Sequence, residues 1–365
     1  MKVWGGDESW HGFLQGPTRV SRLDRFLNDI PWVLFVIGLV LIGLLKAGIQ
    51  LLGTPAALES WPEPLPTADS ISYGNRSIAF ILGWEFSGAY AAISLFVSVV
   101  ALAVLVFALR PGRYGVDGRI LAIVIILGPI GQVLMTNVGG HDAWMILGSL
   151  VTAAFGRKVG GVTVGVVLMS LGNPEQAVIA MGCLLVITLI PNFRERRRST
   201  LFGLILAIAL LGALSLYAML VGVSTRGGYL EEYLLQGLNN FFINFPLSLF
   251  AILGISWIVV AWILTDMSNR NRLFFLVGII AVPLVFTAIT VDQTRVFVGL
   301  SSAALMTALL DAVPRMHREA QLIGLRNPLS WTLLVAVLLP AVLITYTGSV
   351  NIPYAWIFGK FAAMS

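Results

Sequence analysis

Residues 31–53 read PWVLFVIGLVLIGLLKAGIQLLG, and Lys46 is the one charged side chain in this stretch. An α-helix of that length is about 34 Å long, which is enough to cross the ~30 Å hydrocarbon core of a bilayer. The preceding segment, 1–30, is too long and too polar for a cleaved signal peptide. Residues 31–53 are therefore predicted to be a retained first transmembrane helix.

The rest of the chain has the same character. Of its 365 residues, 58% are apolar and 11% are charged, whereas soluble domains carry about 25% charged residues. This composition excludes a water-soluble globule and predicts an all-α, polytopic transmembrane helical bundle of about eleven spans. The predicted spans are 31–53, 78–109, 119–137, 142–156, 159–172, 175–192, 200–223, 246–265, 272–290, 295–311 and 329–347.

The basic residues indicate the orientation of this bundle. If the chain crosses at every predicted span, eighteen of them lie in the amino-terminal segment and alternate loops, and four lie on the opposite side. Basic loops stay in the cytoplasm, so the amino terminus is predicted to be cytoplasmic and the carboxyl terminus to lie outside. The same rule explains the net charge of +5 without a nucleic-acid partner. The four outer residues are Arg76, Arg226, Arg295 and Lys360.

The predicted organisation is one membrane domain with short extensions. Residues 1–30 form a cytoplasmic segment, 31–347 the transmembrane domain, and 348–365 an outer tail. Two longer outer loops cover 54–77 and 224–245, and the second has an amphipathic pattern suited to the membrane interface. The expected location is the bacterial inner (plasma) membrane.

Glycine spacing predicts one tight helical hairpin in this domain. Gly156 and Gly160, and then Gly161 and Gly165, are four residues apart where the fourth and fifth spans meet. Small residues at that spacing let helix backbones approach closely in lipid. The only cysteine, Cys183, excludes an intrachain disulfide and suggests no thiol-ligated metal.

Candidate functional residues are the ionisable groups at the outer ends of the spans. Glu85, Asp142, Glu175, Asp292 and Arg295 all lie there within apolar sequence. Ionisable groups at membrane depth usually face a cavity or a partner, because exposing them to lipid is unfavourable. These residues come from distant hairpins, so we expect them to converge on one outward-facing cleft.

Further candidates lie close to this set. Asp69 and Arg226 belong to the two outer loops, Lys46 lies in the outer half of the first span, and His141 precedes Asp142. The pair of His141 and Asp142 suits a general base or a metal ligand, so a divalent cation stays open and no other cofactor is expected.

Each candidate also has a purely structural interpretation. Asp142 is placed to cap the following helix, and Glu175 follows Pro174 at a helix start, where a carboxylate favours the helix dipole. Asp292 and Arg295 are three residues apart and suited to neutralising each other. Lys46 is able to extend its ammonium group toward the lipid headgroups.

Nucleotide chemistry on the cytoplasmic side is disfavoured. The sequence has no Gly-x-Ser-x-Gly elbow, no His-Glu-x-x-His motif, no phosphate-binding Walker loop and no Asp-rich cytoplasmic motif that binds a nucleotide diphosphate through magnesium.

The layout resembles the polytopic C-type (GT-C) glycosyltransferases and the Wzy-like polysaccharide polymerases. The likeness rests on an acidic first outer loop, carboxylates at outer span ends, outer arginines and an amphipathic outer segment. It covers the whole chain without a diagnostic motif. It implies transfer of a sugar from a polyprenyl phosphate or diphosphate to a glycan or glycolipid acceptor on the non-cytoplasmic face.

The resemblance also implies roles for individual residues. Asp142 is the preferred general base, and Asp69 competes for that role because it occupies the usual first-loop place. Arg295 and Arg226 would hold the departing phosphate. Glu175 and Asp292 would orient sugar hydroxyls or Arg295. The chain departs from well-known members in lacking a large carboxyl-terminal soluble domain and a clear paired-acid motif in its first outer loop, which leaves acceptor recognition and the base open.

Two rival functions stay open. One is an ion- or proton-coupled transporter or lipid-linked sugar flippase with Asp142, Glu175 and Asp292 as relay groups, although no internal repeat typical of transporters is found. The other is a membrane acyltransferase with His141 as its base. A sideways groove for a lipid tail would favour glycosyl transfer, and a polar path through the bundle would favour transport.

Overall fold

A computed structural model describes most of the chain. The described residues are 22–48, 73–84, 86, 88–110, 116–136, 138–220, 227–265, 267–322, 328–339, 341–344 and 350–351. Three predicted site residues, Asp69, Glu85 and Arg226, lie outside these ranges, as does the predicted outer tail except for residues 350–351.

The fold is all-α, as predicted, apart from one small strand pair. The helices are α2 (Arg22–Asp29), α3 (Trp32–Ala47), α4 (Tyr73–Leu82), α5 (Ala89–Ala108), α7 (Val116–Ile126), α8 (Pro129–Thr136), α9 (Asp142–Phe155), α10 (Val159–Gly172), α11 (Pro174–Ile187), the 3₁₀ turn η3 (Pro191–Arg196), α12 (Arg197–Leu220), α13 (Gly227–Ile243), α14 (Leu247–Leu253), α15 (Ser256–Thr265), α16 (Asn269–Leu276), the π-helical η4 (Val277–Ala281), α17 (Val282–Ala288), α18 (Gln293–Leu322) and α19 (Pro328–Leu338). The strands β1 (Leu343–Ile344) and β2 (Val350–Asn351) pair antiparallel.

Several of these helices are long and apolar enough to cross a membrane. Among the described residues four helices meet that test, and up to seven do if each of three bent helix pairs counts as one span. Four further apolar helices have 10–17 residues, fewer than the ~20 that a full crossing needs. The helices indicate a membrane protein, but this count does not confirm about eleven spans.

Bends explain part of the difference. Within predicted spans the pairs α7–α8 and α14–α15 bend by 49° and 82°, and α2 meets α3 at 109° just before the first predicted span. The predicted span 78–109 was wrong as a continuous helix, because it divides into α4 and α5 after Gly83, whose φ of 64° favours glycine. The π-helical η4 precedes Pro283, which has no backbone N–H to donate.

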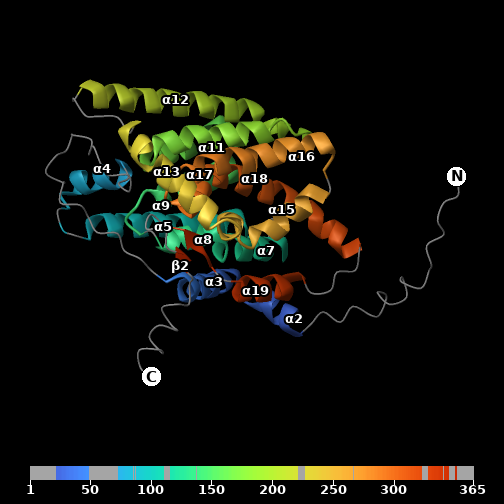
Figure 1. Cartoon of the computed structure of the whole chain (residues 1–365). Helices are drawn as coiled ribbons and strands as arrows, with labels where there is room; N and C mark the ends of the chain where they lie inside the picture. Colours follow the sequence, from blue (N-terminus) through green and yellow to red (C-terminus); the bar gives the residue numbers. More distant parts are fainter. Residues whose placement is uncertain are drawn as a thin grey trace, which may run out of the picture.

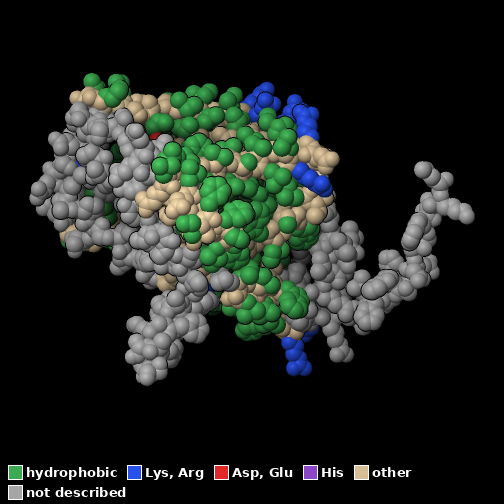
Figure 2. Space-filling model, viewed as in Figure 1, with side chains coloured by type: hydrophobic (Ala, Val, Ile, Leu, Met, Phe, Trp, Pro, Cys, Tyr) green, Lys and Arg blue, Asp and Glu red, His purple; other side chains and the backbone are tan. Residues whose placement is uncertain are grey.

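The longer helices lie side by side as a bundle. In Figure 1 α12 runs along the upper edge, α3 and α19 lie along the lower edge, and α4 lies at the left end. Lys and Arg side chains gather at the right end in Figure 2, where α12 and α16 begin, and around α2. The exposed basic residues there include Arg194, Arg197, Arg198 and Arg270.

The centre of the bundle is built on α9 and α18. Arg295 contacts Asp142 and Ser302 contacts Ser149, and both pairs are 153 residues apart in sequence. A constant offset over seven residues, or two helical turns, means that α9 and α18 run parallel and in register. These helices correspond to predicted spans four (142–156) and ten (295–311), which the predicted order also expects to run in the same direction.

The predicted tight hairpin is formed by α9 and α10, and of the predicted glycines Gly165 lies at a close contact, whose partner Gly148 was not predicted. A Cβ atom on Gly148 would lie 2.5 Å from the carbonyl oxygen of Gly165, and one on Gly165 would lie 2.7 Å from that of Gly148. Nothing lies within 4 Å of the corresponding position at Gly160, so the predicted contact at Gly160 was wrong. A Cβ atom on Gly161 would also meet the Phe155 carbonyl oxygen, so the two helices stay close from their connection to the contact at Gly148 and Gly165.

This contact predicts a large difference between two glycines of the same helix. Gly165→Ala should lower the stability of the protein by about 1–3 kcal/mol, because the added methyl group meets backbone atoms that cannot move independently. Gly160→Ala should be neutral or slightly stabilising, since alanine favours a helix over glycine. Thermal unfolding of both purified variants in the same detergent measures the difference, and equal melting temperatures would contradict the proposed crossing point.

Candidate functional site

Four ionisable residues meet where α9 and α18 begin. The Arg295 guanidinium donates from Nε to Asp142 Oδ2 at 3.0 Å and from Nη1 to Asp292 Oδ2 at 2.7 Å. Its Nη2 also lies 3.0 Å from Asp142 Oδ2, and His141 Nε2 lies 3.7 Å from Asp142 Oδ1. We call His141, Asp142, Asp292 and Arg295 the Arg295 cluster. The structure thus brings together four of the predicted site residues.

The turn before α9 places His141 and Asp142. Gly139 has a φ of 112°, and the following residues enter the helix with the His141 carbonyl accepting from Trp144 and Met145. The proposed capping role of Asp142 was wrong, because the cap position belongs to His141 and its side chain makes no capping bond. The carboxylate of Asp142 is directed to Arg295 instead.

Asn75 of α4 holds this turn from the other side. Its Nδ2 donates to the carbonyls of Gly139 and Gly140 at 2.9 and 3.3 Å, and its Oδ1 accepts from Trp144 Nε1 at 2.8 Å. Asn75 is fully buried. The side-chain amide of Asn75 therefore makes three hydrogen bonds that fix the backbone carrying His141 and Asp142.

A second set of bonds fixes the start of α18. Gln293 accepts from Ser248 Oγ at 3.0 Å and donates to the Gly237 carbonyl at 3.3 Å, which ties α14 and α13 to α18. Thr294 Oγ1 accepts from the backbone N–H of Ile344 in β1 at 3.0 Å. Residues from three other elements thus hold the turn that carries Asp292 and Arg295.

The cluster combines one cation with two carboxylates of unequal access. The side chain of Asp142 is 3% exposed, that of Arg295 11%, and that of Asp292 24%. With neutral His141 the cluster carries one excess negative charge, and burial strengthens each charge-assisted bond. Such a site suits binding hydroxyl groups or taking up a proton, while the guanidinium keeps both carboxylates in place.

Two further predicted site residues, Glu175 and Lys46, lie on α11 and α3. Glu175 is half-buried in the first turn of α11, where Asn173 caps the helix by accepting from the Gln176 N–H at 3.0 Å. Lys46 is buried and donates to the carbonyls of Ala336 at 2.6 Å and Leu127 at 3.4 Å. Lys46 therefore does not extend toward headgroups; its ammonium group joins α3 to α19 and to the break between α7 and α8.

No metal centre is formed by the part of the chain that the structure describes. In these ranges no group of three or more His, Cys, Asp or Glu residues is placed to hold a metal ion. The described side chains of the Arg295 cluster therefore need no cation to account for their arrangement, since Arg295 already bridges the two carboxylates.

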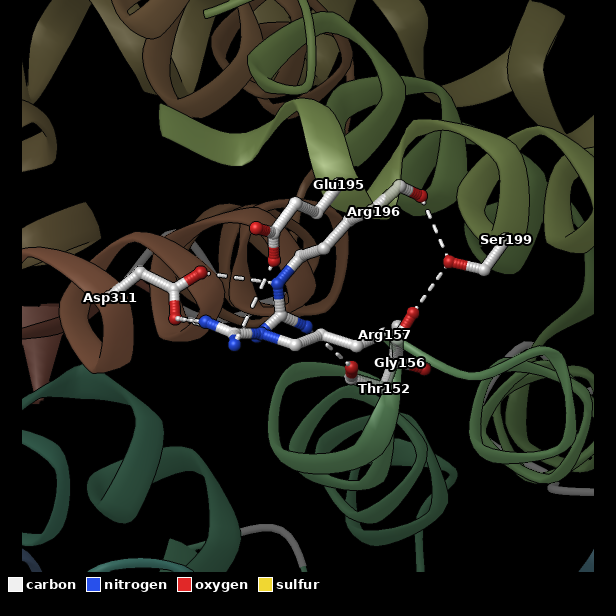
Figure 3. A network of polar contacts seen from close by, with 7 residues as sticks. All are labelled: Thr152, Gly156, Arg157, Glu195, Arg196, Ser199 and Asp311. Carbon is white, nitrogen blue, oxygen red and sulfur yellow. Dashed lines mark hydrogen bonds and ion pairs between the residues drawn. The ribbon is translucent and has the colours of Figure 1, made fainter. Parts of the chain in front are cut away.

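A second charged network lies at the carboxyl end of α9 and at Asp311, where the apolar, span-forming part of α18 ends (Figure 3). Arg196 Nε donates to Asp311 Oδ2 at 3.1 Å, and Arg157 Nη2 lies 3.4 Å from Asp311 Oδ1. Ser199 Oγ donates to the Gly156 carbonyl at 2.6 Å, which satisfies the end of α9. Glu195 in this network is exposed, whereas Asp311 is mostly buried.

Sequence reasoning missed the residues that support the cluster. Asn75 and Gln293 are neutral, and the cost of exposure to lipid marks ionisable groups more strongly than neutral amides. Ser149 and Ser302 carried a usable signal: each lies seven residues after a charged member of the cluster, on the same face of an otherwise apolar helix.

The comparisons with known proteins place the chain in no family. No family model, no curated protein and no solved structure matches it.

The geometry predicts that Arg295 and Asp142 depend on each other for stability. Arg295→Gln should lower the free energy of unfolding by about 3 kcal/mol or more, because it leaves two carboxylates together without their cation. The double variant Arg295→Gln/Asp142→Asn should recover part of the loss. Arg270→Gln, at an exposed position, serves as the control and should have little effect. Additive losses in the double variant, measured by thermal unfolding, would contradict the coupling.

Proposed function

We propose that this protein is a membrane glycosyltransferase or polysaccharide polymerase. It would transfer a sugar from a polyprenyl phosphate or diphosphate carrier to a glycan or glycolipid acceptor on the non-cytoplasmic face. The observation that carries this proposal is the convergence of Asp142, Asp292 and Arg295 from two distant helices. Carboxylates fixed by an arginine at the end of apolar helices offer a base beside the bilayer, where a lipid-linked donor resides.

The proposed topology has about eleven spans, with the amino terminus in the cytoplasm and the carboxyl terminus outside, in a bacterial inner membrane. Two features support it. The parallel direction of α9 and α18 agrees with the predicted order of spans. The network of Arg157, Arg196 and Asp311 lies at the opposite end of the apolar parts of these helices from the Arg295 cluster, as basic loops on one side require.

The proposed chemistry needs one base and a stabilised leaving group. An acceptor hydroxyl gives its proton to a carboxylate of the cluster while its oxygen forms a bond to the anomeric carbon of the donor. The bond from that carbon to the phosphate oxygen breaks, and the phosphate leaves with the electron pair. Arg226 of the predicted outer loop, which lies outside the described residues, stays the proposed phosphate ligand, since Arg295 is occupied by two carboxylates.

The proposal predicts that the protein carries its donor through purification. Mass spectrometry of lipids extracted from the protein, purified in mild detergent, should detect a polyprenyl phosphate or diphosphate bearing a sugar. The same extraction from an unrelated membrane protein of the same host, prepared in parallel, is the control. Absence of any enriched polyprenyl-linked sugar would count against a lipid-linked donor.

It also predicts the loss of product in two variants. Asp142→Asn and Arg295→Ala should each strongly lower polymer or glycolipid formation while the protein still inserts into the membrane. Asp311→Asn is a matched control, because it removes a mostly buried carboxylate of an ion pair at the other end of the apolar part of α18. Product per folded molecule should fall only in the first two variants, and normal product from both would remove the cluster from the mechanism.

A second candidate is a transporter or flippase, and one observation favours it. Ser149 and Ser302 are buried, with 2.8 Å between their hydroxyl oxygens, and they lie between the Arg295 cluster and the network at Asp311. This places polar groups at three levels along α9 and α18. Proteoliposomes that show sugar-lipid or proton flux without any glycosyl transfer would favour this candidate.

A further inference from the structure

The two carboxylates of the Arg295 cluster are not equivalent. Asp142 is almost completely buried, with 3% of its side chain exposed, whereas 24% of the Asp292 side chain is exposed. Both bind the same guanidinium, so they differ in access and not in their cation. A substrate that approaches from outside the protein therefore reaches Asp292 first.

The individual oxygen atoms give the same distinction. Asp142 Oδ2 accepts a hydrogen bond from Nε of Arg295 and lies 3.0 Å from its Nη2, and Oδ1 lies 3.7 Å from His141 Nε2. Asp292 uses only Oδ2, which binds Nη1. Among the described residues nothing donates to Asp292 Oδ1. Each carboxylate therefore bonds to Arg295 through Oδ2, and the Oδ1 atoms differ in their surroundings: that of Asp142 faces His141 on a 3% exposed side chain, and that of Asp292 belongs to a side chain that is 24% exposed.

Asp142 in turn determines where Asp292 lies. Through two nitrogen atoms it fixes the plane of the Arg295 guanidinium, and the third nitrogen then sets the position of Asp292. The backbone beside Asp292 is held by Gln293, which bonds to Ser248 and to Gly237. A base held in this way loses little conformational freedom when the acceptor binds.

We propose that Asp292 is the general base of the transfer and that Asp142 is a positioning residue that acts through Arg295. This assignment rests on the proposed function. The acceptor O–H proton moves to Asp292 Oδ1, the acceptor oxygen bonds to the anomeric carbon, and the carbon–phosphate ester bond breaks with its electron pair on the phosphate oxygen. The proton then passes from Asp292 to water.

The access of each carboxylate is measured without knowing the substrate. Full-length protein in lipid nanodiscs is treated with N,N′-dicyclohexylcarbodiimide, which adds a carboxylic acid across its C=N bond and rearranges to a stable acylurea. Peptide mass spectrometry should find the adduct on Asp292 and little or none on Asp142. In Arg295→Gln both residues should react, because the guanidinium that holds them is gone. Labelling of Asp142 in preference to Asp292 in the wild type would overturn the assignment.

The catalytic roles are separated by transfer measured in membranes from expressing cells, with the donors that those membranes contain. Asp292→Asn should lower product per folded molecule by about 10²–10⁴-fold, as loss of a general base does. Asp142→Asn should lower it by about 10²-fold or less, through misplacement of the base. Asp142→Glu should restore most of the transfer, because it keeps the charge that holds Arg295.

The outcomes are distinct. Abolished transfer in Asp142→Asn together with near-normal transfer in Asp292→Asn would overturn the assignment and leave the proposed function standing. Failure of the wild type to form any glycosylated product in these membranes would overturn the proposed function, and the assignment of a base with it. Carbodiimide labelling is read on the wild type, so a variant that does not fold leaves that test intact.

Discussion

A guanidinium at the end of a membrane-embedded helix must be paired, and Arg295 is paired with carboxylates 3 and 153 residues away. The nearer one comes from its own turn. The distant one requires α9 to lie against α18, parallel and in register, and Ser149 and Ser302 meet two turns further along. The central contact of the bundle is therefore a directional, charge-assisted bond. Such a bond matters in lipid, because apolar helix faces there are not driven together by the hydrophobic effect.

Much of the architecture could be predicted from the sequence. Charged residues are unfavourable in lipid, so stretches without them mark the transmembrane helices, and charged residues mark the ends of those helices. The contact of Asp142, Asp292 and Arg295 was expected for the same reason. Their roles in chemistry stay predictions, as does the number of spans, because α9, α10, α11 and α19 are shorter than a full crossing.

The sequence did not reveal features that depend on the tertiary structure. The break between α4 and α5 at Gly83 and the bend between α14 and α15 depend on local backbone conformation, which amino-acid composition does not encode. Among the glycines, spacing suggested both Gly160 and Gly165, but only Gly165 lies at the close contact of α9 and α10, and its partner Gly148 was not predicted. The roles of the neutral residues Asn75 and Gln293 could not be predicted, because hydrogen bonds to distant carbonyls produce no periodic pattern in the sequence.

The matched seven-residue intervals of α9 and α18 restrict how this protein can diverge. Inserting one residue between Asp142 and Ser149 would turn the later part of α9 by about 100° and separate the serine pair from the ion pair. Replacing either serine with another small polar residue would leave the geometry intact. Distant relatives should thus preserve the interval more faithfully than the side chains, and a charge followed by a hydroxyl at this interval, present twice, is a usable search pattern for them.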